Sequence, residues 1–393
     1  MLFAVLGAFA GCPVSRPASD AVGTSNAGES RLPLQSGDLD ALVEACEPRK
    51  TDTQANAERI RDCYGQHLVE ILQTQGSTVG MLRLYQLAET SPRFAGLCHV
   101  TAHQLSELMY ETVGNISEAM ALCKEGCAHA CQHAVLRTYL LHLPRGTLPD
   151  LREFCPRRTP DELSMSSWQC THAVGHGLAH YYSDPHQALS SCRQFPLYWE
   201  HRRCIQGVFM ELTVMTDDTH ARSSPVPHTL HLCQTVKPDE RFDCYNRLIS
   251  LVGRGTGDAT PRKFAACNAI PPSDRPGCYF GIGRSLPGSY LEREEEAARV
   301  CRSGDSTYTT DCLLGFASVL VNSTNLGRGF EFCGRLNHAA RVRCAESMGR
   351  AVRLLSPRPD QVAAECAKAG EPVYVRACRE VKITPDGLRS DLP

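Results

Sequence analysis

Several familiar signatures are missing from this chain of 393 residues, and each absence removes a class of protein. There is no C-x2-C pair, the spacing that zinc knuckles favour, and no C-x-x-C-H for covalent attachment of haem. The motifs H-E-x-x-H, G-x-S-x-G, G-x-G-x-x-G and G-x-x-x-x-G-K followed by Ser or Thr are absent as well. No enzyme class is therefore indicated by a known motif.

Long apolar runs and a strong net charge are also lacking. No stretch reaches about 18 uninterrupted apolar residues, so we expect no membrane-spanning helix. The formal net charge is −2, and charge therefore favours binding neither to nucleic acid nor to an anionic membrane.

Cysteine, in contrast, is abundant, with 21 residues, and it is regularly spaced from Cys155 onward. From Cys233 the first cysteine of each pair recurs after 34, 34, 32 and 33 residues. A period of about 33 residues is typical of an array of two-helix repeats. This use of cysteine requires an oxidising compartment. With Cys12 set apart, the remaining 20 cysteines form an even number.

Each repeat therefore carries its own predicted disulfide. Four cysteines, Cys98, Cys123, Cys127 and Cys131, do not resolve by spacing. Analogy with the later repeats favours Cys123–Cys131, which leaves Cys98–Cys127, but the sequence keeps this connectivity open. The other pairs that we predict are Cys46–Cys63, Cys155–Cys170, Cys192–Cys204, Cys233–Cys244, Cys267–Cys278, Cys301–Cys312, Cys333–Cys344 and Cys366–Cys378.

Within a repeat, we expect the first cysteine to end a short helix of about 8–10 residues, which is marginal alone. A polar loop follows, and the second cysteine begins a longer apolar helix, as in Cys312-Leu-Leu-Gly-Phe-Ala. Antiparallel packing at about 8–10 Å can bring the two cysteines within bonding distance. Three residues after the second cysteine the side chain is usually small, which predicts close helix approach: Ala134, Ala173, Gly207, Gly281, Gly315 and Ser347.

The pattern Ala-x-x-x-Cys followed by Cys-x-x-Gly, over about residues 155–380, resembles the Helicobacter cysteine-rich protein family. The resemblance implies disulfide-linked, tetratricopeptide-like repeats in an exported interaction scaffold, and it implies no catalytic residue. Together with the period, it predicts an all-α fold. We expect a right-handed α/α solenoid of about nine disulfide-stapled hairpins over residues 39–381, with an extended concave surface.

The N-terminal segment 1–12 resembles a bacterial lipoprotein signal, because apolar residues and Phe-Ala-Gly precede Cys12. Cys12 would be the lipidated residue; an ordinary cleaved signal peptide is the alternative, and both predict export. Residues 13–38 are predicted to be a flexible tether and 382–393 a loose tail. We therefore expect a periplasmic or cell-surface protein of the bacterial envelope, held to the membrane only by a lipid anchor.

Histidines concentrate in the first half of the array. His99 and His103, and likewise His172 and His176, are spaced i, i+4, which places each pair on one helix stripe. Two neutral imidazoles one turn apart can share a metal ion. With His133, these residues form a candidate zinc, copper or iron site, and Glu107 is a candidate ligand or base.

A structural role for these histidines is the alternative. His99 and His103 lie one and five residues after their cysteine, whereas His172 and His176 lie two and six after theirs. That offset turns one stripe by about 100° against the other, unless the early repeat is irregular.

The predicted function is therefore an exported scaffold whose groove binds a protein, peptide or cell-wall component. A polar line along the second helices would contribute to this groove, and it contains Arg137, His180, Arg284 and Arg350. The alternative is a metal-binding protein or a metal-dependent hydrolase that uses the histidine cluster. No nucleic-acid partner is expected.

Overall fold

A computed structural model describes residues 36–47, 54–124, 126–151, 155, 165–215, 227–254, 259–286, 293–323, 326–355 and 358–381. Throughout these residues the regular structure is helical, without a strand, and the predicted all-α fold is confirmed. The predicted signal, Cys12 and the tail lie outside the described residues. Helix α1 (Ser36–Cys46) begins within the last residues assigned to the tether.

The helices follow one another as antiparallel pairs. The N-terminal part contains α2 (Gln54–Gln75), α3 (Ser77–Thr90), α4 (Pro92–Val113), α5 (Ile116–Leu122), η1 (Cys127–His129) and α6 (Ala130–His142). The later short helices are α8 (Pro185–Cys192), α10 (Pro227–Thr235), α12 (Ala259–Asn268), α14 (Glu294–Arg302), α16 (Leu326–Gly334) and α18 (Pro359–Ala367). Each of these short helices has a partner, which we call a second helix. The second helices are α7 (Met165–Tyr182), α9 (Tyr198–Met215), α11 (Arg241–Leu248), α13 (Arg275–Arg284), α15 (Thr309–Ser323), α17 (His338–Leu355) and α19 (Pro372–Glu380). Two short 3-10 helices also occur here: η4 (Ile249–Leu251) follows α11, and η6 (Ser306–Tyr308) precedes α15.

Ten disulfides are present, and eight join the cysteines that the spacing pairs. The other two, Cys98–Cys127 and Cys123–Cys131, have the connectivity favoured by analogy with the later repeats. Most of the ten disulfides close one hairpin, as Cys301–Cys312 does between α14 and α15 with Cα atoms 5.5 Å apart. Cys98–Cys127 differs, because it joins α4 to η1 over a separation of 29 residues. The prediction that the second cysteine begins its helix was wrong. Cys278 is the fourth residue of α13 and Cys204 is the seventh of α9, so these helices begin about one to two turns before their cysteines.

Close approach of the second helices depends on glycine. A Cβ atom on Gly207 would lie 2.1 Å from the backbone oxygen of His172, and one on Gly315 would lie 1.9 Å from that of Phe280. Gly281 faces Asn246 in the same way, at 2.5 Å. The packing interpretation is therefore confirmed for these three glycines, because a methyl group there would overlap a neighbouring backbone.

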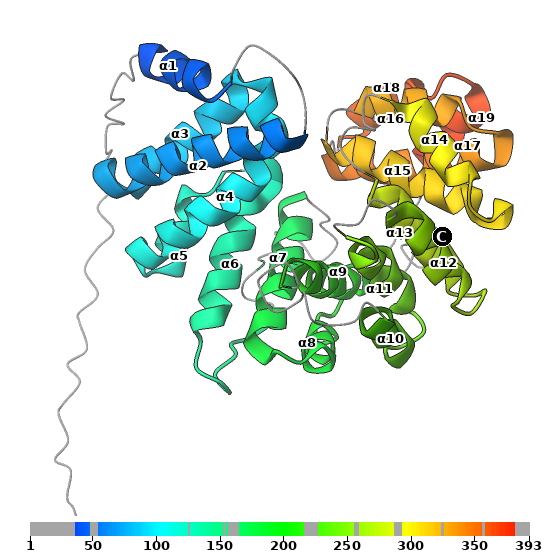
Figure 1. Cartoon of the computed structure of the whole chain (residues 1–393), viewed down its shortest axis with the longest axis horizontal. Coiled ribbons are helices and arrows are strands. Elements are labelled where there is room, and N and C mark those ends of the chain that lie inside the picture. Colours follow the sequence, from blue (N-terminus) through cyan, green and yellow to red (C-terminus); the bar gives the residue numbers. More distant parts are fainter. Residues whose placement is uncertain are drawn as a thin grey trace, which may run out of the picture.

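The hairpins stack in chain order. Each second helix packs against the next, from α7 through α9, α11, α13, α15 and α17 to α19, and α4 and α6 extend the series at its N-terminal side. Figure 1 shows the array bending, with α1 and α19 near its two upper ends and α8 and α10 near the bottom. This serial order is consistent with the predicted solenoid.

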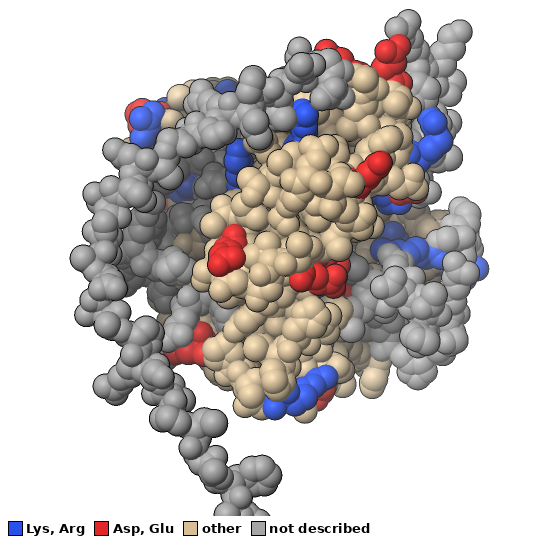
Figure 2. Space-filling model, turned by 90° about the vertical axis from the view of Figure 1, so that its left-hand side faces the viewer, with Lys and Arg blue, Asp and Glu red and all other residues tan. Residues whose placement is uncertain are grey.

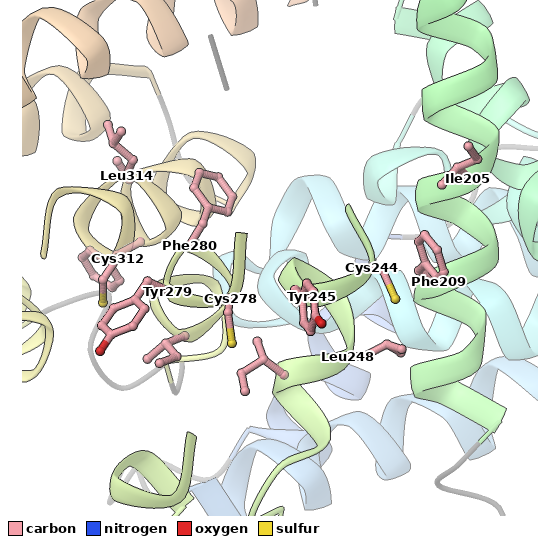
Figure 3. Close-up of a cluster of buried hydrophobic side chains, with 14 of the residues drawn as sticks. Ile205, Phe209, Cys244, Tyr245, Leu248, Cys278, Tyr279, Phe280, Cys312 and Leu314 are labelled. Carbon is pink, nitrogen blue, oxygen red and sulfur yellow. The ribbon is translucent and has the colours of Figure 1, made fainter. Parts of the chain in front are cut away.

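The apolar core follows the same order. In Figure 3, Phe209, Tyr245 and Tyr279 come from the consecutive helices α9, α11 and α13 and follow one another across the core beside Cys244 and Cys278. All five side chains are fully buried. None of the described helices has the length and apolarity needed to cross a bilayer.

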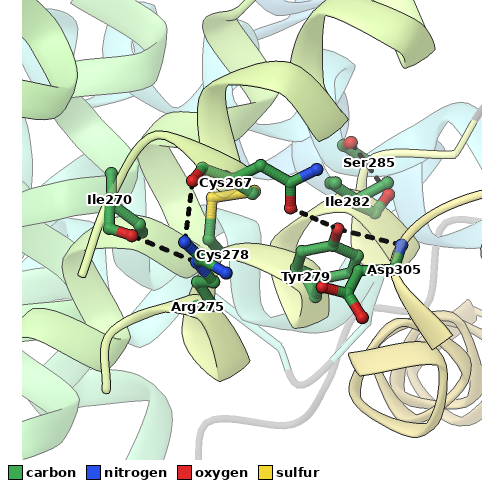
Figure 4. The surroundings of a disulfide bond; sticks show 9 residues. Cys267, Ile270, Arg275, Cys278, Tyr279, Ile282, Ser285 and Asp305 are labelled. Carbon is green, nitrogen blue, oxygen red and sulfur yellow. Dashed lines mark hydrogen bonds between the residues drawn. A yellow bond between two sulfur atoms is a disulfide. The ribbon is translucent and has the colours of Figure 1, made fainter. Parts of the chain in front are cut away.

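The hairpin around Cys267–Cys278 shows how a loop is fixed beside its disulfide (Figure 4). The Arg275 guanidinium donates to the backbone oxygens of Ile270 and Asn268 at 3.1 and 2.8 Å. The hydroxyl of Tyr279 donates to the Asn268 side chain at 2.8 Å. These bonds satisfy carbonyl groups that the end of α12 leaves without helical partners.

Two apolar clusters meet within α6. One contains buried residues from Cys46 to Val135, and the other contains buried residues from Leu136 to Cys378. Buried polar side chains gather at this junction, beginning with His133.

Candidate metal centre

Three helices bring the predicted histidines together. His99 and His103 come from α4, His133 from α6, and His172 and His176 from α7. The ring of His133 lies at the middle of the group, with its centroid 5.7 Å from His103, 5.4 Å from His172 and 5.7 Å from His176. Five side chains that span 78 positions of sequence therefore form one cluster.

The offset between the two histidine stripes does not separate them. The ring centroids of His103 and His176 are 6.4 Å apart. The reason is that Cys98 bonds to η1 rather than within its own hairpin. Its place along α4 therefore does not correspond to the place of Cys170 along α7, and the early repeat is the irregular one.

The tautomers of His172 and His176 follow from their partners. The Nδ1 atom of His176 lies 2.5 Å from a carboxylate oxygen of Glu211, and that of His172 lies 3.3 Å from the backbone oxygen of Arg203. A carbonyl and an ionised carboxylate can only accept, so both Nδ1 atoms carry the proton and donate. Both Nε2 atoms then present lone pairs, and these two atoms are 3.1 Å apart.

Two bare lone pairs that face each other repel unless a cation lies between them. Zinc–imidazole bonds of about 2.0–2.1 Å at a tetrahedral angle place two ligand nitrogens about 3.3 Å apart. The separation between His172 and His176 is close to that value. The separation is therefore compatible with two ligands on one metal ion.

The other histidines present nitrogen atoms to the same space. His99 donates from Nδ1 to the backbone oxygen of Cys127 at 3.0 Å, which leaves its Nε2 as a ligand atom. His133 is 3% exposed, and neither of its ring nitrogens has a hydrogen-bond partner. Ligand atoms of His99, His103 and His133 lie within 4.8 Å of one another. A buried imidazole without partners requires an explanation, and metal ligation supplies one.

The cluster favours neutral imidazoles. Burial lowers the pKa of His103, His133 and His172 well below the ordinary value, and neighbouring histidine and arginine charges lower it further. Neutral imidazole is the form that ligates a metal. Near neutral pH these three side chains are therefore ready to bind one.

Glu211 in α9 is the residue that the sequence analysis missed. It is buried, and besides His176 it accepts from His180 Nε2 at 2.5 Å and from Arg137 at 3.2 Å. Burial alone would raise the pKa of Glu211, but the hydrogen bonds from His176 and His180 outweigh it and lower this pKa. The only signal was one carboxylate inside the apolar run Ile205-Gln-Gly-Val-Phe-Met-Glu-Leu.

Among the described residues, Glu107 makes no hydrogen bond to any of the five clustered histidines. Its carboxylate is hydrogen-bonded to Arg137, which also bridges to Glu211. Burial raises the pKa of Glu107, and the charge of Arg137 opposes that rise. Glu107 thus belongs to an ion-pair network beside the histidines.

The four residues predicted to line a groove do not form one set. Arg137 and His180 both contact Glu211. Arg284 is half-buried in α13, and Arg350 is buried in α17.

A second grouping of ligand-type residues is Cys46, Cys63 and His67. Its two sulfur atoms are joined in a disulfide and are not thiolates, and His67 is exposed. This grouping therefore lacks the chemistry of a metal site.

Charge is sparse on the face of the molecule turned to the viewer in Figure 2. Among the described residues, only scattered Lys, Arg, Asp and Glu side chains of both signs appear there.

Comparisons of the chain with models of protein families, with curated proteins and with solved structures give no match.

Proposed function

We propose that the protein binds a transition-metal ion through the histidines of α4, α6 and α7. The observation that carries this proposal is the pair of bare Nε2 atoms on His172 and His176, 3.1 Å apart. Imidazole ligands suit zinc, copper and iron. His172 and His176 supply one pair of ligand atoms, and His99, His103 and His133 supply a set of three beside it.

Glu211 would act on the metal through His176. A carboxylate that accepts from the Nδ1 proton fixes the tautomer, orients the ring and makes Nε2 a stronger ligand. The backbone oxygens of Arg203 and Cys127 do the same for His172 and His99. Three of the five histidines therefore have their ligand atom selected by a partner outside the cluster.

A proton is the competing occupant. If His176 carried a second proton on Nε2, it would donate to His172 and pair with Glu211 in the same geometry. Metal content separates these two explanations, because a protonated pair needs no ion.

The test uses the oxidised full chain loaded with Zn²⁺, dialysed and measured by elemental analysis. We expect at least one zinc per chain, lost when His172 and His176 are both changed to Ala. The matched control is His231→Ala, because His231 is exposed in α10, away from the cluster. Absence of bound zinc in protein with an unchanged helical circular dichroism spectrum would refute the proposal.

The ten disulfides support an oxidising, exported environment for the protein, and location in the bacterial envelope stays a prediction. Capture of a protein, peptide or cell-wall component stays a prediction. The exposed large apolar side chains among the described residues are Val100, Leu141 and Val373, which belong to three different helices. Hydrolase activity likewise stays a prediction. Its candidate base, Glu107, is paired with Arg137.

A further inference from the structure

Three arginines gather on the helices that follow the histidine cluster. Arg203 belongs to α9, Arg247 to α11 and Arg284 to α13, which pack in that order. All three side chains are half-buried. The Arg247 guanidinium reaches Met210 at 3.6 Å, and Met210 lies two turns after Arg203 on the same face of α9. The positive charge of Arg284 acts on both Arg203 and Arg247.

None of these guanidinium groups has a carboxylate hydrogen-bond partner in the described part of the chain. Arg203 donates to the side-chain oxygens of Gln206 and Gln169 at 2.8 and 3.1 Å and stacks 4.9 Å from the ring of Trp168. Its Nε atom is buried without a partner.

Arg247 and Arg284 have still fewer partners. Arg247 approaches only the sulfur of Met210, at 3.6 Å, and its Nε atom is also buried without a partner. Arg284 makes no hydrogen bond or ion pair to the described residues. Each guanidinium carries five N–H donors, so most of the donors in this group are unused.

The nearest carboxylate is already engaged. Asp243 accepts from Arg202 at 2.9 Å through one oxygen and from the Gln206 amide at 2.9 Å through the other. Arg202 therefore balances the charge of Asp243. The negative charge of Asp243 also acts on Arg203, Arg247 and Arg284, but one carboxylate already paired with Arg202 leaves these three charges largely in excess.

We propose that Arg203, Arg247 and Arg284 form a binding site for a phosphate group, either free phosphate or a phosphate monoester. Guanidinium groups recognise tetrahedral oxyanions through paired N–H donors, and a doubly charged anion offsets more of the excess positive charge than a carboxylate would. Burial, and then the charge of Arg284, lowers the pKa of Arg203 to about 9, as expected where cations are crowded and poorly solvated.

The site adjoins the candidate metal centre through Arg203, whose backbone oxygen orients His172. The two sites remain separable, because the arginines do not depend on metal for their placement. Metal-free protein therefore tests the phosphate site alone, and a failure there leaves the metal proposal untouched.

The experiment is calorimetric titration of chelator-treated, oxidised full chain with inorganic phosphate and, separately, with phenyl phosphate at low chloride. We expect a dissociation constant below about 1 mM for at least one of the two. Arg284→Gln should weaken binding about 10- to 100-fold, since it removes charge-assisted hydrogen bonds. The control is Arg302→Gln, which removes the same charge from an exposed position and should leave binding unchanged.

A second measurement protects the test against misfolding. Arg284→Gln relieves repulsion, so without phosphate its melting temperature should equal or exceed that of the original chain, while phosphate no longer raises it. Arg247→Gln should behave in the same way. Undetectable binding of both probes, or equal binding by the Arg284→Gln and Arg302→Gln variants, would overturn the proposal, as would a clear loss of stability in both Arg284→Gln and Arg247→Gln.

Discussion

Early and late second helices make the same close contact at a glycine, but the side chains beside that contact differ. Gly207 lets α9 approach α7 at His172, and Gly315 lets α15 approach α13 at Phe280. The residue two positions after the second cysteine is His133 in α6 and His172 in α7, but Phe280 in α13 and Leu314 in α15. One scaffold position thus carries a proposed metal ligand in one region and a core apolar side chain in the other.

The same contrast holds further along these helices. Seven residues after the second cysteine, α9 has the carboxylate Glu211, whereas the next four hairpins have the uncharged residues Leu251, Ser285, Val319 and Ala351. The comparison teaches that the disulfide-stapled hairpin and the close helix contact are general. The buried polar chemistry is added by a few side chains at fixed positions.

The largest expected effect comes from breaking the close contact in either region. Gly207→Ala and Gly315→Ala each force a methyl group against a backbone oxygen, so we expect a loss of about 3 kcal/mol in the free energy of unfolding. Urea denaturation measures it. Only Gly207→Ala should also lower zinc affinity, because it displaces His172.

Gly334→Ala is the control for both variants, since no atom lies within 4 Å of the added methyl group. It should change stability by less than about 1 kcal/mol. If Gly315→Ala proved equally harmless, the close packing described here would be wrong.

The next effect concerns Glu211. Glu211→Gln keeps the shape but removes the carboxylate that orients His176, so we expect zinc affinity to fall about 10- to 100-fold. A competition titration with a zinc-binding dye measures the change.

Glu240→Gln is the matched control. Glu240 is also a buried carboxylate, but it binds Arg193 rather than a histidine of the cluster. It should lose stability and keep its zinc affinity. Equal zinc affinities in the Glu211→Gln and Glu240→Gln variants would remove Glu211 from the metal centre.

The smallest effect lies in the late region. Asn268→Ala deprives the buried Tyr279 hydroxyl of its acceptor, which should cost about 1 kcal/mol of stability. Thermal unfolding measures it, and zinc content should not change. A change in zinc content would show that the late hairpins affect the candidate metal centre, and it would contradict the independence of these two regions.

Much of the fold could be predicted because the decisive contacts are local. Cys267 and Cys278 lie in neighbouring helices, so their spacing predicts both the disulfide and the hairpin. The spacing does not predict the start of α13 at Arg275, because the cysteine period does not show that Cys278 lies a turn inside its helix.

The candidate site was predictable only in part. The pair His172 and His176 follows from helical spacing within α7. Glu211 belongs to the next hairpin, and the packing of α9 on α7 brings it to His176. The position of His103 likewise depends on where Cys127 holds α4, which no periodicity along the chain specifies.

The most direct test is X-ray diffraction from zinc-loaded crystals at the zinc absorption edge. The account predicts an anomalous peak about 2 Å from Nε2 of both His172 and His176. Crystals from zinc-containing solution with no peak between these two nitrogens, or with zinc only on exposed histidines, would contradict it.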